Sequence, residues 1–168
     1  MATTTATRFE RALEDLGVTV EYATAEEATE RIAEAVEEPA AGVPLPFEGV
    51  SLPDDLETDL SRVPLESLRT GVTPARFAIA EYGSLAIEST PDGDEPVSLY
   101  PDRHVAVVAE SDVLPDLASA FDRLEAWFAG GRDSVVFATG VSATADMGEL
   151  VDGVHGPHDV HVIVVEDR

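Results

Sequence analysis

Apolar residues recur at helical spacing in the N-terminal part of the chain and again around residue 120. Thr-x-x-Glu capping boxes stand at the start of the first two stretches, and glycines follow the first and the third. We therefore expect helices over residues 8–16 and 24–36, a helix that is capped by Asp112 and ends at Gly130, and a helix from Ser142 or Thr144 to about residue 151.

Short apolar runs between these stretches are typical of strands. Residues 105–109 are continuously apolar, as a strand buried on both faces would be, and residues 134–139 predict a second such strand. Residues 77–80 and 85–88 flank a Glu-Tyr-Gly-Ser turn and predict a hairpin. The other predicted elements are strands at 18–22, 97–100 and 160–165, a short helix near 54–60, a polar turn at 90–96, and a proline-rich loop at 39–53 with at most one short strand.

Strands and helices alternate through the second half of the chain, which is the pattern of a parallel sheet covered by helices. A length of 168 residues suits one compact domain. We expect a single α/β domain over residues 1–168, with three layers and a mostly parallel sheet that has helices on both faces. Residues 1–7 are expected to fray.

The charge and the missing residue types exclude several classes of function. Asp and Glu number 34, the ten cationic residues are all arginines, and the formal net charge is −24. Such a chain is repelled by nucleic acid and by anionic membranes. Without lysine it has no P-loop and no Schiff-base amine. Without cysteine it has no thiolate nucleophile, and it holds no iron–sulfur cluster on cysteine ligands.

The acidic residues are dispersed along the chain rather than clustered. This dispersal and the absence of lysine favour adaptation to a high-salt cytoplasm over an acidic binding face, because ~1 M salt shortens the Debye length to ~3 Å and screens self-repulsion. The N-terminus lacks the pattern of a signal peptide, and no apolar run approaches the roughly 20 residues of a membrane span. We expect a cytoplasmic protein; the oligomeric state is left open, a homo-oligomer included.

Three short segments at the ends of predicted strands carry candidate chemistry, since open α/β sheets bind ligands there. They are residues 80–85, 139–146 and 153–157. If a helix begins at Ser142, its free backbone N–H groups suit a phosphate or a carboxylate; ordinary capping is the alternative. The candidate ligand-binding residues are Gly83, Ser84, Thr139, Gly140, Ser142, Thr144, Asp146 and Gly156.

Glu81 and His155 are the candidate catalytic residues. Glu81 precedes a glycine as in the acyl-accepting segment of CoA transferases, where a carboxylate attacks a thioester; a solvated turn glutamate is the alternative. His155 suits a general acid–base role, with a loop-capping histidine as the alternative. We predict no metal site, because His158 and His161 would face opposite sides of a strand. His104, near the start of a predicted strand, is a further candidate, but a loop-edge histidine is the favoured interpretation.

The order and spacing of the three segments resemble the LUD domain, the lactate utilization protein C family. That family shows an Ala-Glu-Thr-Gly-Thr-like segment, then Thr-Gly-Pro-Ser-x-Thr-x-Asp-Ile, then Gly-x-His-Gly-Pro before a last apolar strand. The match covers about residues 73–165. The chain departs from the pattern at Tyr82, Val141, Met147 and Ala143, where the family often has a basic residue.

The resemblance implies a sheet like that of the ribose-phosphate isomerase and CoA-transferase group. It also implies a role in oxidising L-lactate to pyruvate alongside iron–sulfur subunits, without defining the step that this chain performs. Two alternatives stay open: a stand-alone CoA-thioester or sugar-phosphate enzyme using Glu81, and a non-catalytic scaffold. The cofactor is unknown, and whether the chain is an enzyme stays open.

Overall fold

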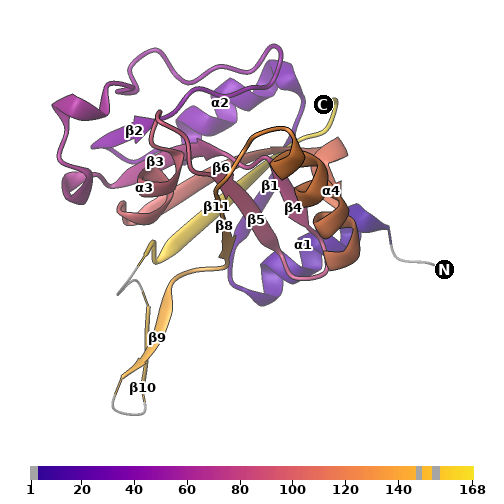
Figure 1. The fold of residues 1–168 in the computed structure, drawn as a ribbon. Coiled ribbons are helices and arrows are strands. Elements are labelled where there is room, and N and C mark those ends of the chain that lie inside the picture. The colour runs from indigo at the N-terminus through magenta and orange to yellow at the C-terminus, as the bar shows by residue number, and fades with distance from the viewer. Residues whose placement is uncertain (1–3, 147–148, 153–155) are drawn as a thin grey trace.

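Five parallel strands form the larger sheet of the protein (Figure 1). A computed structural model describes residues 4–146, 149–152 and 156–168. The strands are β1 (Thr19–Ala23), β2 (Ala40–Gly42), β3 (Thr70–Pro74), β6 (Arg103–Ala109) and β11 (Asp159–Val165). Their order is β1-β11-β6-β3-β2, so the last strand of the chain is inserted between the first strand and β6.

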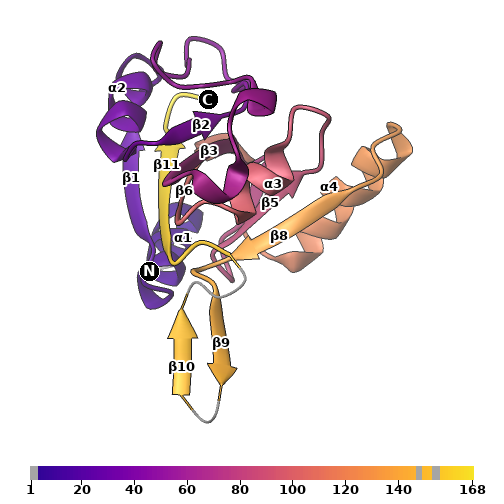
Figure 2. The ribbon, with the colours of Figure 1, turned by 90° about the vertical axis from the view of Figure 1, so that its left-hand side faces the viewer.

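A smaller mixed sheet packs against the larger one. It contains β4 (Phe77–Ile79), β5 (Ser84–Glu88), β7 (Val113–Leu114) and β8 (Val135–Thr139) in the order β7-β4-β5-β8. β5 pairs antiparallel with both β4 and β8. Beyond β8 the chain forms a third, two-stranded antiparallel sheet, β9 (Ala143–Asp146) and β10 (Glu149–Asp152), which projects from the body (Figure 2).

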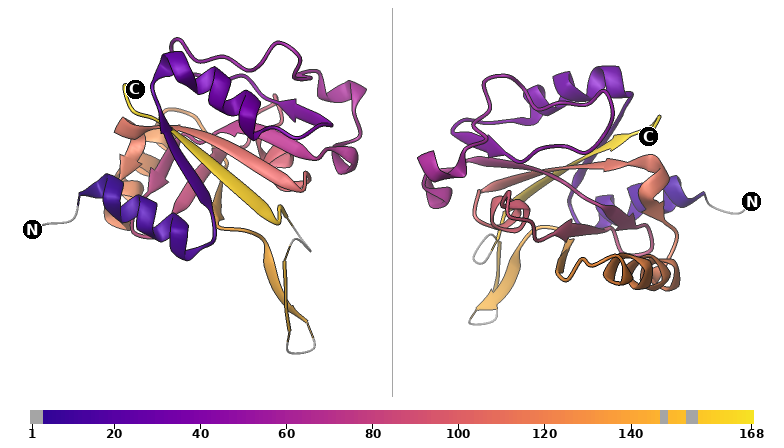
Figure 3. Two further views of the ribbon diagram at one scale, coloured as in Figure 1. Left: turned by 180° about the vertical axis from the view of Figure 1, so that it is seen from behind. Right: turned by 45° about the horizontal axis from the view of Figure 1, so that its top comes forward.

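In the described residues, four α-helices cover these sheets (Figure 3): α1 (Thr5–Asp15), α2 (Ala25–Ala35), α3 (Asp94–Leu99) and α4 (Leu117–Ala129). Helix α2 packs on one face of the larger sheet, where Ile32 joins Val105 and Ile163 in a buried cluster. Helix α1 and the inner face of the smaller sheet pack on the opposite face. Helix α4 covers the outer face of the smaller sheet, with Trp127 against Phe77. Three short 3₁₀ helices, η1 (Leu60–Arg62), η2 (Leu65–Ser67) and η3 (Glu110–Asp112), lie in the connections.

The central strands are apolar on both faces, which is why they appear in the sequence as unbroken apolar runs. Along β6, Ala106 and Val108 face the cluster that includes α1, whereas Val105 and Val107 face α2. The α/β class, with a mostly parallel sheet and helices on both faces, is confirmed. In the described part of the chain, no helix is long and apolar enough to cross a membrane.

Most of the strongly patterned elements lie where the sequence predicts them. The first two helices, the hairpin of β4 and β5, the buried strand β6 and the last strand β11 are confirmed within a few residues. The proline-rich loop at 39–53 holds one short strand, β2, as expected. Helix α1 begins earlier than predicted: Thr4, not Thr7, is its cap, so residues 5–7 are helical rather than frayed.

Several other predicted elements were wrong. Residues 97–99 belong to helix α3 and Tyr100 is its C-cap, rather than forming a strand, and α3 begins inside the predicted turn at 90–96. Asp116, not Asp112, caps α4, accepting from the backbone N–H of Ser119 at 2.9 Å. Residues 54–60 form no α-helix. β8 is half-exposed because it is an edge strand, and the helix predicted from Ser142 is instead the β9–β10 hairpin.

Candidate functional site

The three motif segments meet at one pocket of ≈ 210 Å³. Apolar side chains of α1, β8 and β11 form much of its wall. It lies beside the carboxyl end of β8 and at the amino ends of β6 and β11. The sequence analysis had instead expected a site at the carboxyl ends of the parallel strands. We call it the motif pocket; the motif residues that line it are Gly83, Thr139, Gly140, Ser142, Gly156 and Pro157.

A pair of hydroxyl groups lies at the motif pocket: Thr139 lines it, and the buried Ser84 is the partner of Thr139. Ser84 and Thr139 are opposite each other in the pairing of β5 with β8, and their side-chain oxygens lie 2.7 Å apart. Either oxygen can be the donor in this hydrogen bond. The Thr139 hydroxyl can therefore donate to, or accept from, a group in the pocket while Ser84 takes the opposite role in their shared hydrogen bond.

Gly83 and Gly140 allow two turns to pack over the end of α1. Their φ angles are +66° and +69°, a region that side chains other than glycine rarely adopt. A Cβ atom at Gly140 would lie 3.2 Å from the side chain of Leu16, and one at Gly83 would lie 3.0 Å from it. The backbone conformation thus explains both glycines without a ligand.

The second and third motif segments are joined directly. The backbone N–H of Ser142 donates to the carbonyl of Pro157 at 2.8 Å. A Cβ atom at Gly156 would lie 3.2 Å from the Cβ of Ser142, so a glycine there permits the close approach. Segments that are distant along the chain are therefore brought together at the mouth of the motif pocket.

The remaining candidates are not gathered in the same way. Glu81 lies in an exposed turn and is not among the residues that line the motif pocket. Thr144 and Asp146 belong to strand β9, so the helix N-terminus that would have bound an anion does not form. His155 lies outside the described residues. No arginine is found among the described residues that line the pocket.

The expectation that His104 lies at a loop edge was wrong, and the sequence reasoning set aside a residue that belongs to the candidate site. His104 is buried at the start of β6, it lines the motif pocket, and its Nε2 lies 2.8 Å from Oγ1 of Thr73. Burial lowers the pKa of His104 to about 4, so its imidazole is neutral at pH 7 and can donate or accept. The available signal was strand alternation, which places His104 on the same face as Ala106.

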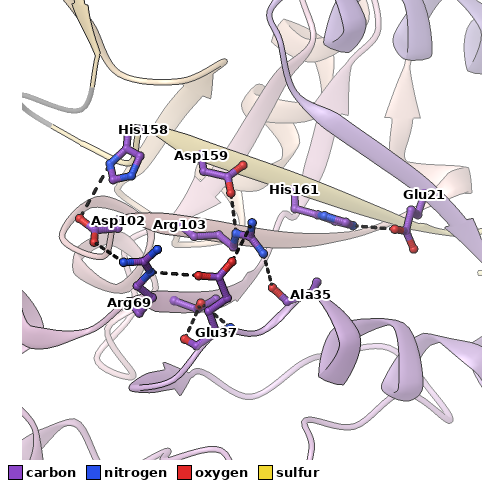
Figure 4. A network of polar contacts seen from close by, with 10 residues as sticks. Glu21, Ala35, Glu37, Arg69, Asp102, Arg103, His158, Asp159 and His161 are labelled. Carbon is purple, nitrogen blue, oxygen red and sulfur yellow. Dashed lines mark hydrogen bonds and ion pairs between the residues drawn. The ribbon is translucent and has the colours of Figure 1, made fainter.

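A polar network lies at the amino ends of β3, β6 and β11, on the other face of the larger sheet (Figure 4). Arg103 is its centre: it contacts Asp159 at 2.6 Å, the carbonyl of Ala35 at 2.8 Å and Glu37 at 3.2 Å. His158 lies 3.8 Å from Asp102 in the same network. These contacts join the end of α2 to two strands, so the network stabilises the fold.

His161 neighbours this network, 3.4 Å from Glu21. Burial lowers its pKa, opposed by the Glu21 carboxylate. Across the described ranges, no group of three histidines, cysteines or carboxylates is arranged to hold a metal ion.

The fold and the pocket define an α/β protein with its candidate site at the junction of a parallel sheet and a smaller mixed sheet. The LUD domain family model matches residues 6–165, and the chain belongs to that family. A crystal structure of a DUF162 family protein from Deinococcus radiodurans superimposes with a TM-score of 0.74 over 98% of this chain and 99% of that one, at 24% identity, which shows the same fold.

Curated relatives carry the name Lactate utilization protein C. The Deinococcus radiodurans protein is 33% identical over 168 residues, covering 94% of this chain and 78% of its own length. The Bacillus licheniformis and Bacillus subtilis proteins are 36% and 34% identical over 107 residues, which is 61% of this chain. The match takes in 45% of each Bacillus protein, so the chain spans about half the length of those relatives.

Proposed function

We propose that this chain is a lactate utilization subunit that supports the oxidation of L-lactate to pyruvate together with iron–sulfur partner proteins. The observation that carries the proposal is the convergence of the three motif segments on one pocket, in a chain whose relatives are named Lactate utilization protein C. Oxidation of lactate to pyruvate releases two electrons and two protons. With no cysteine to hold a cluster, this chain needs a partner or a bound cofactor to accept the electrons.

The motif pocket suits an uncharged or apolar group better than a bare anion. Its polar groups are hydroxyls and the neutral His104, and most of its wall is apolar. A carboxylate without a guanidinium or ammonium partner loses solvation on entering such a pocket. We therefore propose that Thr139 and Ser142 hydrogen-bond a polar group of a larger ligand or partner, with Ser84 orienting the hydroxyl of Thr139.

The remaining sequence candidates have specific places in this proposal. His155 adjoins Gly156 in the sequence and is our proposed acid–base group. Thr144 and Asp146 are proposed to extend the same site through β9. The alternative of a stand-alone CoA-thioester or sugar-phosphate enzyme has less support, because its nucleophile would be Glu81, which lies in an exposed turn outside the pocket lining. No observation favours a scaffold without a ligand.

A host strain lacking this gene provides the test. It would carry the wild-type chain, the double variant Ser84→Ala/Thr139→Val, or the control Ser111→Ala, whose side chain is exposed and outside the pocket. We expect the wild-type and control chains to restore growth on L-lactate and lactate-dependent dye reduction in extracts. The double variant, which keeps the size of Thr139 and removes only the hydroxyl oxygen of Ser84, should restore neither.

Affinity purification from the same strain tests the partners. Iron-containing polypeptides should co-purify with the wild-type chain during growth on L-lactate. Normal growth on L-lactate without the gene would refute the proposed function, and co-purified proteins without iron would refute the proposed partners.

A further inference from the structure

A second pocket, of ≈ 340 Å³, lies on the outer side of the smaller sheet beside helix α4. Its volume lies within the range of pockets for small molecules. Three of the chain's ten cationic residues surround it, although the net charge of the chain is −24. We call it the arginine pocket; it is lined by Arg76, Phe77, Arg123, Ala126, Trp127 and Arg132.

Two aromatic rings form the apolar part of the arginine pocket. Phe77 and Trp127 pack edge to face, with ring centroids 5.9 Å apart and an interplanar angle of 71°. The guanidinium of Arg132 lies 5.5 Å from the centroid of the Trp127 ring, in the range of a cation–π contact. Flat apolar surface and guanidinium groups are thus next to each other in one cavity.

Neighbouring carboxylates hold the guanidinium groups in place. Nε of Arg76 lies 2.9 Å from Glu88, and Nε of Arg132 lies 3.2 Å from the other oxygen of the same carboxylate. Glu88 is mostly buried, with 16% of its side chain exposed. Arg123 is held from outside the pocket by Asp112, at 2.9 Å from its NH1 group. The arginines are therefore positioned before any ligand arrives, which lowers the entropy cost of binding.

These ion pairs leave donors unused. A guanidinium carries five N–H donors. The contacts above occupy Nε of Arg132 and one terminal nitrogen of Arg123, and no other hydrogen bond of these two side chains is found among the described residues. A carboxylate or a phosphate accepts two parallel hydrogen bonds from such a group. The motif pocket offers no comparable donors, since arginine is absent from its described lining.

We infer that the arginine pocket binds a small organic anion in which a carboxylate or a phosphate group is attached to a flat, apolar body. The anionic group is held by Arg123 and Arg132, and the body lies against the Phe77–Trp127 pair. This site is separate from the motif pocket, so the inference does not depend on the proposed lactate utilization role.

Trp127 is the only tryptophan of the chain, so its fluorescence reports directly on this pocket. The probes are phenyl phosphate, benzoate, benzyl alcohol and inorganic phosphate, each titrated at constant potassium chloride concentration. We expect saturable quenching of the Trp127 fluorescence by phenyl phosphate or benzoate. Whichever compound binds more tightly identifies the anionic group that the pocket prefers. Benzyl alcohol lacks the anion and inorganic phosphate lacks the flat body, so each should bind at least tenfold more weakly.

Arg132→Gln and Arg123→Gln should each weaken binding about tenfold or more, through loss of the guanidinium donors. Two variants are used so that a folding defect in one, seen by thermal unfolding, leaves the other informative. Arg62→Gln is the matched control, because Arg62 is exposed, pairs with Asp59 and does not line the pocket. The inference would be overturned if the Trp127 fluorescence showed no saturable change with either aromatic anion up to ~10 mM. It would also be overturned if both pocket variants bound the anions with unchanged affinity. Binding of benzyl alcohol or inorganic phosphate as tight as that of the aromatic anions would overturn it too.

Discussion

Arg103 and His104 are consecutive residues at the start of β6, yet they serve opposite faces of the larger sheet. Arg103 contacts Asp159, Glu37 and the end of α2, as Figure 4 shows. His104 is buried on the other face, where it lines the motif pocket. Alternation of side chains along the strand produces this division. One strand end therefore provides both a structural ion-pair network and a wall of the candidate site.

Burial of His104 makes the stability of the protein depend on pH. Its pKa in the folded state is about 4, below the ordinary value of 6.5. As the pH falls from 6.5 towards 4, the imidazole of His104 is therefore protonated in the unfolded chain but stays neutral in the folded chain. The stabilisation from this residue is fully present above pH 6.5, and about 2 kcal/mol of it is lost between pH 7 and pH 5.

His104→Gln isolates this effect from the titration of the many carboxylates. Denaturant unfolding at constant salt should show the difference in unfolding free energy between wild type and variant narrowing by about 2 kcal/mol from pH 7 to pH 5. His158→Gln, which removes an exposed histidine, is the control. A difference that is independent of pH would show that the imidazole is not held neutral.

Arg103→Lys should destabilise the fold although it conserves the charge. The ammonium group of lysine cannot reproduce the separate contacts of the guanidinium with Asp159, Glu37 and the Ala35 carbonyl. The side chain of Arg103 is only 25% exposed, so we expect a loss of about 1–3 kcal/mol, measured by urea unfolding. Arg31→Lys, in the exposed Arg31–Glu34 pair, should cost under about 0.5 kcal/mol. Equal effects of the two variants would contradict the central role of Arg103.

Gly71→Ala should be severely destabilising. A Cβ atom at Gly71 would lie 2.0 Å from the backbone carbonyl oxygen of Val97 in α3, so the helix would have to move away from β3. We expect a loss of at least about 3 kcal/mol in thermal or denaturant unfolding. Gly130→Ala is the matched control, because its nearest contact would be 3.2 Å and its φ of −78° suits alanine. If Gly71→Ala lowered the free energy of unfolding by less than about 1 kcal/mol, helix α3 would be able to move away from β3 at little cost.

The elements that the sequence predicted are those with a local signal. Capping residues and an apolar stripe specify α1 and α2, and unbroken apolar runs specify β6 and β11. Strand β3 was missed because its five residues include Gly71 and Pro74, which are unusual in a strand. Its glycine is required by the helix that packs on it. Such contacts between distant segments produce no periodic pattern of residues in the sequence, so they could not be predicted from it.

The candidate site was predictable to a similar extent. The segments that hold Gly83, Thr139 and Gly156 were picked out by their places at predicted strand ends, and the structure brings them to one pocket; ligand binding there stays a prediction. His104 was assigned to a loop edge because its Thr73 partner is contributed by a neighbouring strand, and the pairing of β3 with β6 is visible only in the fold. The hairpin after Ser142 was missed because the same hydroxyl residues that cap helices also occur in strands.

The dispersed acidic residues predict a fold that depends on salt. With 34 acidic residues against ten cationic ones, self-repulsion opposes the folded state in dilute buffer. Shortening the Debye length from ~10 Å at ~0.1 M to ~3 Å at ~1 M potassium chloride screens this repulsion between exposed carboxylates. The melting temperature should therefore rise steeply from low salt to ~1 M potassium chloride. Sodium chloride at equal ionic strength should act similarly if screening is the cause, whereas a melting temperature that stays flat or falls as salt increases would refute adaptation to high salt.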